Sequence, residues 1–68
     1  MRLIKLEEVK RKTTLSRTSI YKLAVENLFP KPVTVIGRSR VWVEEEIDDW
    51  IRARIAERNG TAQLAIGN

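Results

Sequence analysis

The stretch TTLSRTSIYKLAVENLFPKP, residues 13–32, decides the fold. It opens with two adjacent threonines, which are β-branched hydroxyl residues and favour a turn over a helix interior. Ser16 is a good N-cap for a helix that follows this turn. Pro30 ends that helix, because proline lacks a backbone donor and disfavours helical geometry in the residue before it. Asn27 is a suitable left-handed terminating residue. The stretch therefore predicts a turn followed by one short helix.

The predicted helix has two different faces. One face recurs at helical spacing and holds Ile20, Leu23, Ala24 and either Asn27 or Leu28. The opposite face is polar and holds Arg17, Thr18, Tyr21, Lys22 and Glu26, with Ser19 near its edge. The helix has too few apolar residues to serve only as part of the core, so we expect its polar face to bind a partner.

The segment before this stretch, RLIKLEEVKRKT, predicts another helix of about two turns that starts near Leu6. Its acids precede its bases, an order that matches the helix macrodipole. Val9 and Leu15, together with Leu6, are expected to pack on the apolar face of the next helix. Two short helices joined by about three residues are typical of a helix-turn-helix.

The segment after the stretch, VTVIGRSRVWV, changes to β-rich sequence. Its two runs, Val33 to Ile36 and Arg40 to Val43, flank the Gly37-Arg38-Ser39 sequence and predict a short hairpin, which we call the wing. One side of the hairpin is expected to hold Val33, Val35, Val41 and Val43. Trp42 alternates out of phase with its neighbours, and a core position is favoured for it.

The segment EEEIDDWIRARIAERNG predicts a last helix that ends at Gly60. One face of it holds Ile47, Trp50, Ile51, Arg54 and Ile55, and its spacing predicts that Trp50 lies in the core. The acids come first and complement the helix dipole, so they indicate capping and not a metal or acid–base site. The fold class predicted is mainly α with a small β-hairpin, a winged helix-turn-helix.

Length and composition limit the possible functions. A chain of 68 residues predicts one domain, here residues 1–60, followed by a flexible or partner-binding tail over residues 61–68. The absence of Cys and His excludes disulfides and thiolate zinc sites and removes the usual general base. We therefore expect no catalytic residue, no cofactor and no metal. No apolar run is long enough for a signal sequence or membrane span, so we expect a soluble cytoplasmic protein with no membrane partner.

The charge is divided unevenly along the chain. Residues 1–43 hold ten bases and three acids, a net +7, whereas residues 44–68 hold three bases and six acids, a net −3. A basic field collected on one surface attracts a polyanion such as nucleic acid or an anionic membrane. The alternative is that these are ordinary solvated side chains.

The polar face and the wing predict a binding site for double-stranded DNA. In a helix-turn-helix the second helix enters the major groove, where Arg binds guanine in a bidentate manner and Ser or Thr approaches base edges. The residues expected there are Arg17, Thr18, Ser19 and Lys22, with Tyr21 on a phosphate. Wing residues expected to reach a phosphate or the minor groove are Lys31, Arg38, Ser39 and Arg40.

Two alternatives remain open for these residues. In the first alternative, Tyr21 is half-buried on the flank of the helix and Arg17 only solvates it, so that neither contacts DNA. In the second alternative, the wing arginines, Arg38 and Arg40, are solvated turn residues whose charge prevents the edge of the short sheet from pairing with another strand.

The ordered set LSRTSIYKL, FPKPV, GR and VWVEEEIDDWI resembles the AlpA family of prophage regulators. These are small winged helix-turn-helix proteins similar to excisionases and to the DNA-binding domain of MerR-type regulators. The resemblance covers residues 2 to about 58 and implies a recognition helix that opens at Ser16-Arg17 and a wing at Gly37-Arg38. Two positions depart from the family pattern: Glu45 replaces a serine that often caps the last helix, and Val41 replaces a small residue before the tryptophan.

Three functional hypotheses follow. The favoured one, implied by the resemblance, is a sequence-specific DNA-binding transcriptional regulator of phage or prophage type. The second is an excisionase-like architectural factor that bends DNA for an integrase. The third is an adaptor whose segment 64–66 recruits an integrase or RNA polymerase. Because so small a domain covers only a short half-site, we expect a homodimer or cooperative tandem binding.

Overall fold

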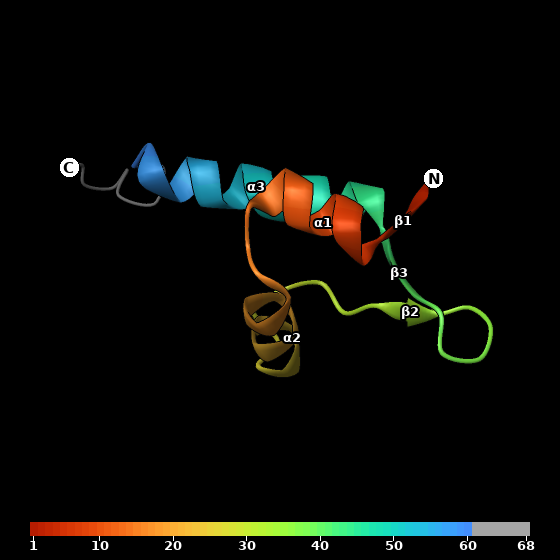
Figure 1. Cartoon of the computed structure of the whole chain (residues 1–68). Helices are drawn as coiled ribbons and strands as arrows, with labels where there is room; N and C mark the ends of the chain where they lie inside the picture. Colours follow the sequence, from red (N-terminus) through yellow and green to blue (C-terminus); the bar gives the residue numbers. More distant parts are fainter. Residues whose placement is uncertain (61–68) are drawn as a thin grey trace.

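The protein is described by a computed structural model over residues 1–60, and this part of the chain forms three helices and one small sheet. The elements are β1 (Leu3–Lys5), α1 (Leu6–Thr13), α2 (Arg17–Val25), β2 (Val33–Thr34), β3 (Arg40–Val43) and α3 (Glu44–Arg58). Helices α1 and α3 lie side by side, α2 lies on one side of this pair, and the turn between β2 and β3 projects away from the helices (Figure 1). This is the predicted winged helix-turn-helix, mainly helical with a small β wing.

Local sequence signals determine where α1 ends and α2 begins and ends. The Ser16 hydroxyl accepts a hydrogen bond of 3.2 Å from the backbone N–H of Ser19 and so caps α2. Thr14, with φ 63°, closes α1, and its N–H donates to the Lys10 carbonyl at 2.7 Å. Asn27, with φ 62°, adopts the left-handed conformation just after α2. The predicted helix, turn and helix are therefore confirmed.

The sheet has one strand more than the predicted hairpin. Strand β1 pairs with β3 in antiparallel register, with Ile4 opposite Trp42, so the strand order is β1-β3-β2. Strand β2 is shorter than predicted and ends at Thr34. The rest of the predicted strand enters the turn, because Ser39 donates its N–H to the Ile36 carbonyl at 2.9 Å. The turn therefore begins within the β-rich run, before Gly37.

The core is centred on Trp42. Its side chain is fully buried, together with Val9, Ile20 and Ile47. Its indole N–H donates to the Pro30 carbonyl at 3.1 Å, so the one polar atom of the ring is satisfied. The favoured core position of Trp42 is confirmed.

Trp50 was expected in the core, but it is only half-buried at the edge of it. Its ring meets Phe29 edge-on at 4.8 Å between centroids, and its N–H donates to the Leu28 carbonyl at 2.8 Å.

Helix α3 has fifteen residues and α1 only eight, so the later turns of α3 extend beyond α1 (Figure 1). For this reason Ile55, predicted on the buried face of α3, is 44% exposed.

The valine-rich side of the wing faces outward. Val33 pairs with Val41, and residues two apart on a strand share a face, so Val33, Val41 and Val43 lie on one side as predicted. Val35 was predicted on the same side, but it lies beyond the end of β2. The valine face is opposite to the one that carries Trp42, and Val33 and Val35 are both exposed. Asn27 and Leu28, the two alternatives for the last position of the apolar face of α2, are both exposed because they lie past the end of that helix.

Charged side chains join α1 to the start of α3. The Lys12 ammonium lies 2.9 Å from a Glu44 carboxylate oxygen and 2.8 Å from one of Asp48, and Arg2 lies 2.8 Å from Glu44. No side chain caps α3: its N-cap is Val43, and Glu45, expected at the capping position, lies within the first turn of the helix. The first N–H of this helix donates to the Arg2 carbonyl at 2.8 Å instead. The N-terminal strand thus completes the start of α3.

This arrangement predicts a pH dependence of stability. The hydrogen bond from Lys12, with a further contribution from Arg2, lowers the pKa of the Glu44 carboxyl. A group whose pKa is lower in the folded than in the unfolded state adds stability above its unfolded pKa, and this stability is lost as the pH falls through the folded pKa. Glu44→Gln should therefore be less stable than wild type at pH 7, and the difference should shrink between about pH 5 and pH 2. Melting temperatures followed by circular dichroism test this, and a difference that does not change with pH would contradict it.

Candidate nucleic-acid interface

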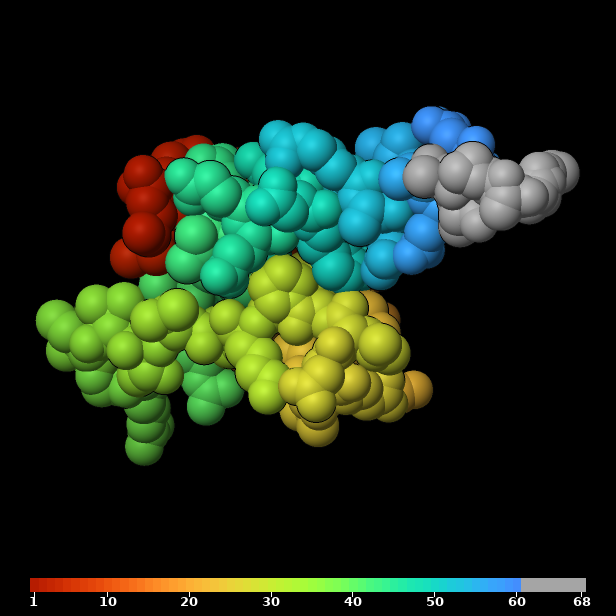
Figure 2. All heavy atoms as spheres, turned by 180° about the vertical axis from the view of Figure 1, so that it is seen from behind, coloured from red at the N-terminus to blue at the C-terminus, as the bar shows by residue number. Residues whose placement is uncertain are grey.

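Helix α2 and the wing occupy the same side of the molecule. In Figure 2 the wing, in green, and the end of α2 with the loop that follows it, in yellow, lie below α3, in cyan and blue. The orientation of α2 follows from its apolar face, since Ile20 and Ala24 are buried against the core. Its polar face is left outward, with Thr18 and Lys22 exposed.

A hollow of about 520 Å³ lies between α2 and the wing. Its lining comprises Arg17, Tyr21, Thr34, Gly37, Arg38 and Arg40. Three guanidinium groups therefore meet there, and no acidic side chain is present among the described residues that line it. Like charges gathered in a concave surface raise the local potential and favour an anion.

Tyr21 is at the centre of this hollow. Its half-buried ring meets Trp42 edge-on at 5.9 Å, which ties it to the core. The guanidinium carbon of Arg17 lies 5.5 Å from the centroid of the same ring, and that of Arg40 lies 5.9 Å from it. Both distances are within the range of a cation–π interaction. Tyr21 thus holds one arginine from α2 and one from the wing around a single ring.

A second hollow adjoins the first and adds another cation. It shares Tyr21, Thr34 and Arg40 with the first hollow and extends to Lys31 and Pro32. We call the two hollows together the basic cleft, which comprises Arg17, Tyr21, Lys31, Thr34, Arg38 and Arg40. Its shape and sign fit a polyanion that lies across α2 and the wing.

The structure brings together five of the nine residues predicted to contact DNA, namely Arg17, Tyr21, Lys31, Arg38 and Arg40. Thr18 and Lys22 lie outside the cleft on the exposed face of α2. Ser19 is half-buried, and its hydroxyl accepts a hydrogen bond of 3.1 Å from the Ser16 hydroxyl. Ser39 does not line the cleft, but it lines a neighbouring depression that also includes Glu7 and the cleft residue Arg40. DNA contact by these nine residues remains a prediction.

Sequence reasoning missed Thr34, which lines both hollows. Strand β2 pairs Thr34 with Arg40, so the two side chains lie on the same face of the sheet. Thr34 is the one polar residue in the run Val33 to Ile36, and its alternation with the valines was the signal that could have identified it.

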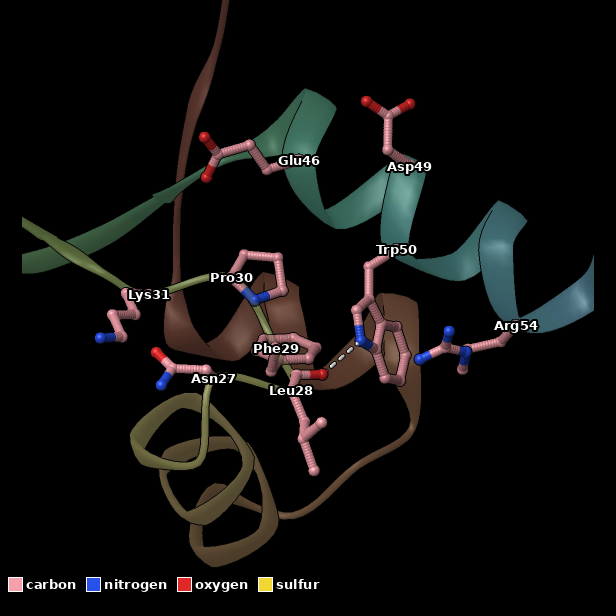
Figure 3. A pocket seen from close by; sticks show the side chains of 9 residues that line it. All are labelled: Asn27, Leu28, Phe29, Pro30, Lys31, Glu46, Asp49, Trp50 and Arg54. Carbon is pink, nitrogen blue, oxygen red and sulfur yellow. Dashed lines mark hydrogen bonds between the residues drawn. The ribbon is translucent and has the colours of Figure 1, made fainter.

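A different hollow, of about 710 Å³, lies between α3 and the loop after α2 (Figure 3). Its floor includes Trp50 and Phe29, and the dashed line marks the indole hydrogen bond to the Leu28 carbonyl. The rim carries both signs of charge, with Glu46 and Asp49 as well as Lys31 and Arg54. A rim of mixed charge gives no net attraction for a polyanion, so the basic cleft is the better candidate site.

Two further observations concern residues 1–60. None of the helices formed there combines the length and apolar character needed to cross a bilayer. That part of the chain also contains no group of three or more acidic, histidine or cysteine side chains arranged to hold a metal ion.

Comparison with known proteins gives two matches. The family model described as "Prophage CP4-57 regulatory protein (AlpA)" matches residues 2–55, which include α2 and the whole wing. A curated relative, "Uncharacterized protein ORF88" of Enterobacteria phage P4, is 35% identical over 57 residues. This alignment covers 84% of the present chain and 65% of the relative, so the chain spans slightly less than two thirds of the relative's length.

Proposed function

The chain belongs to the AlpA family of prophage regulatory proteins, and on this basis we propose that it binds double-stranded DNA in a sequence-specific manner to regulate transcription. The observation that carries the proposal is the basic cleft, in which cations of α2 and of the wing surround Tyr21. A regulator of this kind needs one element that reads bases and others that fix its position on the backbone.

In the proposed complex, α2 enters the major groove. Thr18 and Lys22 are exposed on its outward face and approach base edges, while the free amides at its start face a phosphate. Arg38 and Arg40 extend from the wing to the next stretch of backbone or the minor groove. Tyr21 directs its hydroxyl toward a phosphate held in the cleft. Ser19 and Ser39 are retained as proposed contacts at the edges of this surface.

We propose that Arg17 contacts the Tyr21 ring in the free protein and a guanine base in the complex. In the free protein its guanidinium lies over the Tyr21 ring, an exposed contact that contributes about 0.5–1 kcal/mol. A bidentate contact with guanine contributes about 1–3 kcal/mol of discrimination. We propose that Arg17 leaves the ring for a guanine when the correct sequence is present.

Assembly on DNA follows from the size of the domain. One short recognition helix covers a short half-site, which discriminates poorly in a genome. We therefore propose that residues 1–60 form one binding domain that acts as a homodimer or as cooperative tandem copies. The proposed place of action is the bacterial cytoplasm, on the nucleoid. No catalytic step is part of this function.

The adaptor hypothesis concerns residues 61–68, which lie outside the described residues. An integrase or RNA polymerase remains a proposed partner for segment 64–66. Deletion of residues 61–68 should abolish capture of that partner and leave DNA affinity unchanged. Equal capture of the partner by the full-length and the truncated chain would remove the hypothesis.

Lys31→Ala tests the electrostatic part of the proposal. Lys31 lines the basic cleft, but its ammonium group lacks the planar fork of donors with which arginine makes two hydrogen bonds to one base. Its loss should weaken binding to all sequences alike and lower the slope of log K against log salt by about one. Titrations at several salt concentrations measure this slope. Arg52→Ala is the control, because it removes an equal charge from α3, outside the cleft.

A further inference from the structure

The wing carries an exposed apolar tip. Ile36 is 76% exposed, and Val35 beside it is 52% exposed. The turn beneath them is closed by hydrogen bonds in both directions, from the Val35 N–H to the Ser39 carbonyl at 3.1 Å and from the Ser39 N–H to the Ile36 carbonyl at 2.9 Å. Gly37 provides the positive φ of 56° that this reversal requires. Ile36 is therefore presented to solvent on a hydrogen-bonded support.

Folding gains little apolar burial from this residue. Full burial of an isoleucine side chain contributes about 1.5–3 kcal/mol, and Ile36 packs against none of the core residues. A position with this exposure is available to a polar residue without loss of packing. Ile36 is thus the part of the wing that a binding partner would have to cover.

The charges around Ile36 indicate the kind of partner. Residues 27–43 contain three cations, Lys31, Arg38 and Arg40, and no acid. Arg38 and Arg40 are both exposed and lie two and four residues after Ile36. An apolar side chain that is closely followed in sequence by two exposed arginines matches a partner that is anionic outside and apolar within. Duplex DNA has this character, with phosphates at the rim of each groove and stacked bases between them.

We propose that Ile36 is an apolar wedge that enters the DNA minor groove beside the site contacted by α2 and bends the duplex by partly unstacking one base step. The proposal rests on the proposed DNA-binding function and adds to it a bend and a residue that causes it. Apolar side chains of this kind open a step and kink DNA by about 20–90° toward the major groove. A flexible pyrimidine–purine step is the expected site, because such steps unstack most easily.

A second copy of this chain is the other partner to consider. The outward valine face of the wing adjoins Ile36, and two such faces could cover one another. Two wings would, however, bring together Lys31, Arg38 and Arg40 of each copy, while the depression beside Val41 holds a single acid, Glu7, among its lining residues. DNA is favoured by this difference in charge.

The test combines affinity and bend angle. Random duplexes are first selected on the wild-type protein, and a duplex of about 30 base pairs with the selected site is labelled at both ends for energy transfer. Wild-type protein should shorten the end-to-end distance. Ile36→Ala should lose most of this change, while its affinity falls less than about tenfold because the lost contact and the avoided bending cost offset each other. Its melting temperature should be that of wild type.

Ile55→Ala is the matched control, since it makes the same substitution at an exposed site on α3 and should bend DNA like wild type. Specific binding by wild type without a bend would overturn the wedge and leave the proposed function intact. An unchanged bend with Ile36→Ala would also overturn it, and a loss of dimers in light scattering would then assign Ile36 to a second copy. Failure of selection to enrich any sequence would instead contradict the proposed function.

Discussion

Trp42→Ala is expected to lower the free energy of unfolding by about 3–5 kcal/mol, enough to leave a domain of this size largely unfolded at 37 °C. Trp42 has no exposed surface and lies among Ile4, Ile20 and Ile47 in the centre of the core. Its removal leaves a cavity and also frees the Pro30 carbonyl that accepts its N–H. The wing would then lose its attachment to the helices.

Urea unfolding followed by far-ultraviolet circular dichroism measures this effect without reliance on tryptophan fluorescence. Trp42→Phe should be less harmful, because a ring remains against Tyr21 and only the hydrogen bond and some volume are lost. Val25→Ala, at a side chain that is 79% exposed, should be within about 0.5 kcal/mol of wild type. A similarly small effect of Trp42→Ala would show that the core is not centred on this residue.

Arg17→Ala is expected to reduce affinity for the selected site by about 1–3 kcal/mol and affinity for random DNA by much less. The reason is that the lost interaction is with a base, which only the correct sequence supplies. Titrations of wild type and variant on both duplexes at one salt concentration give the two losses directly.

Arg17→Lys separates base reading from charge. Lysine keeps the positive charge but lacks the planar fork that makes two hydrogen bonds to guanine. This variant should keep the salt dependence of wild type and still lose most of the discrimination. Equal losses on the two duplexes for Arg17→Ala would mean that Arg17 contacts only phosphate, as one of the three guanidiniums of the cleft.

Features of the fold that depend on neighbouring residues were predictable from the sequence. The Ser16 cap, the left-handed Asn27 and the turn at Gly37 each follow from the chemistry of one residue and its immediate neighbours. The same is true of the outward polar face of α2, which follows from helical spacing. These features were sufficient to predict a winged helix-turn-helix.

Features that depend on distant pairing were not predictable in the same way. Strand β1 has three residues, too few to show an alternating pattern, and it exists because β3 pairs with it. The exposure of Ile55 depends on how far α3 extends past α1, which periodicity within α3 does not reveal. The contacts within the site were likewise hidden, because neither helical spacing nor strand alternation shows that Arg17 and Arg40 meet at Tyr21.

Sequence-specific binding is tested by fluorescence anisotropy of the protein on two duplexes, one of random sequence and one from DNA that flanks its own gene, each at low and moderate salt. We expect tighter binding to the flanking DNA and a difference in affinity that persists when salt is added, because base contacts are less sensitive to salt than phosphate contacts. Equal affinities that both vanish at moderate salt would contradict this expectation, since the basic cleft would then attract DNA without reading its sequence.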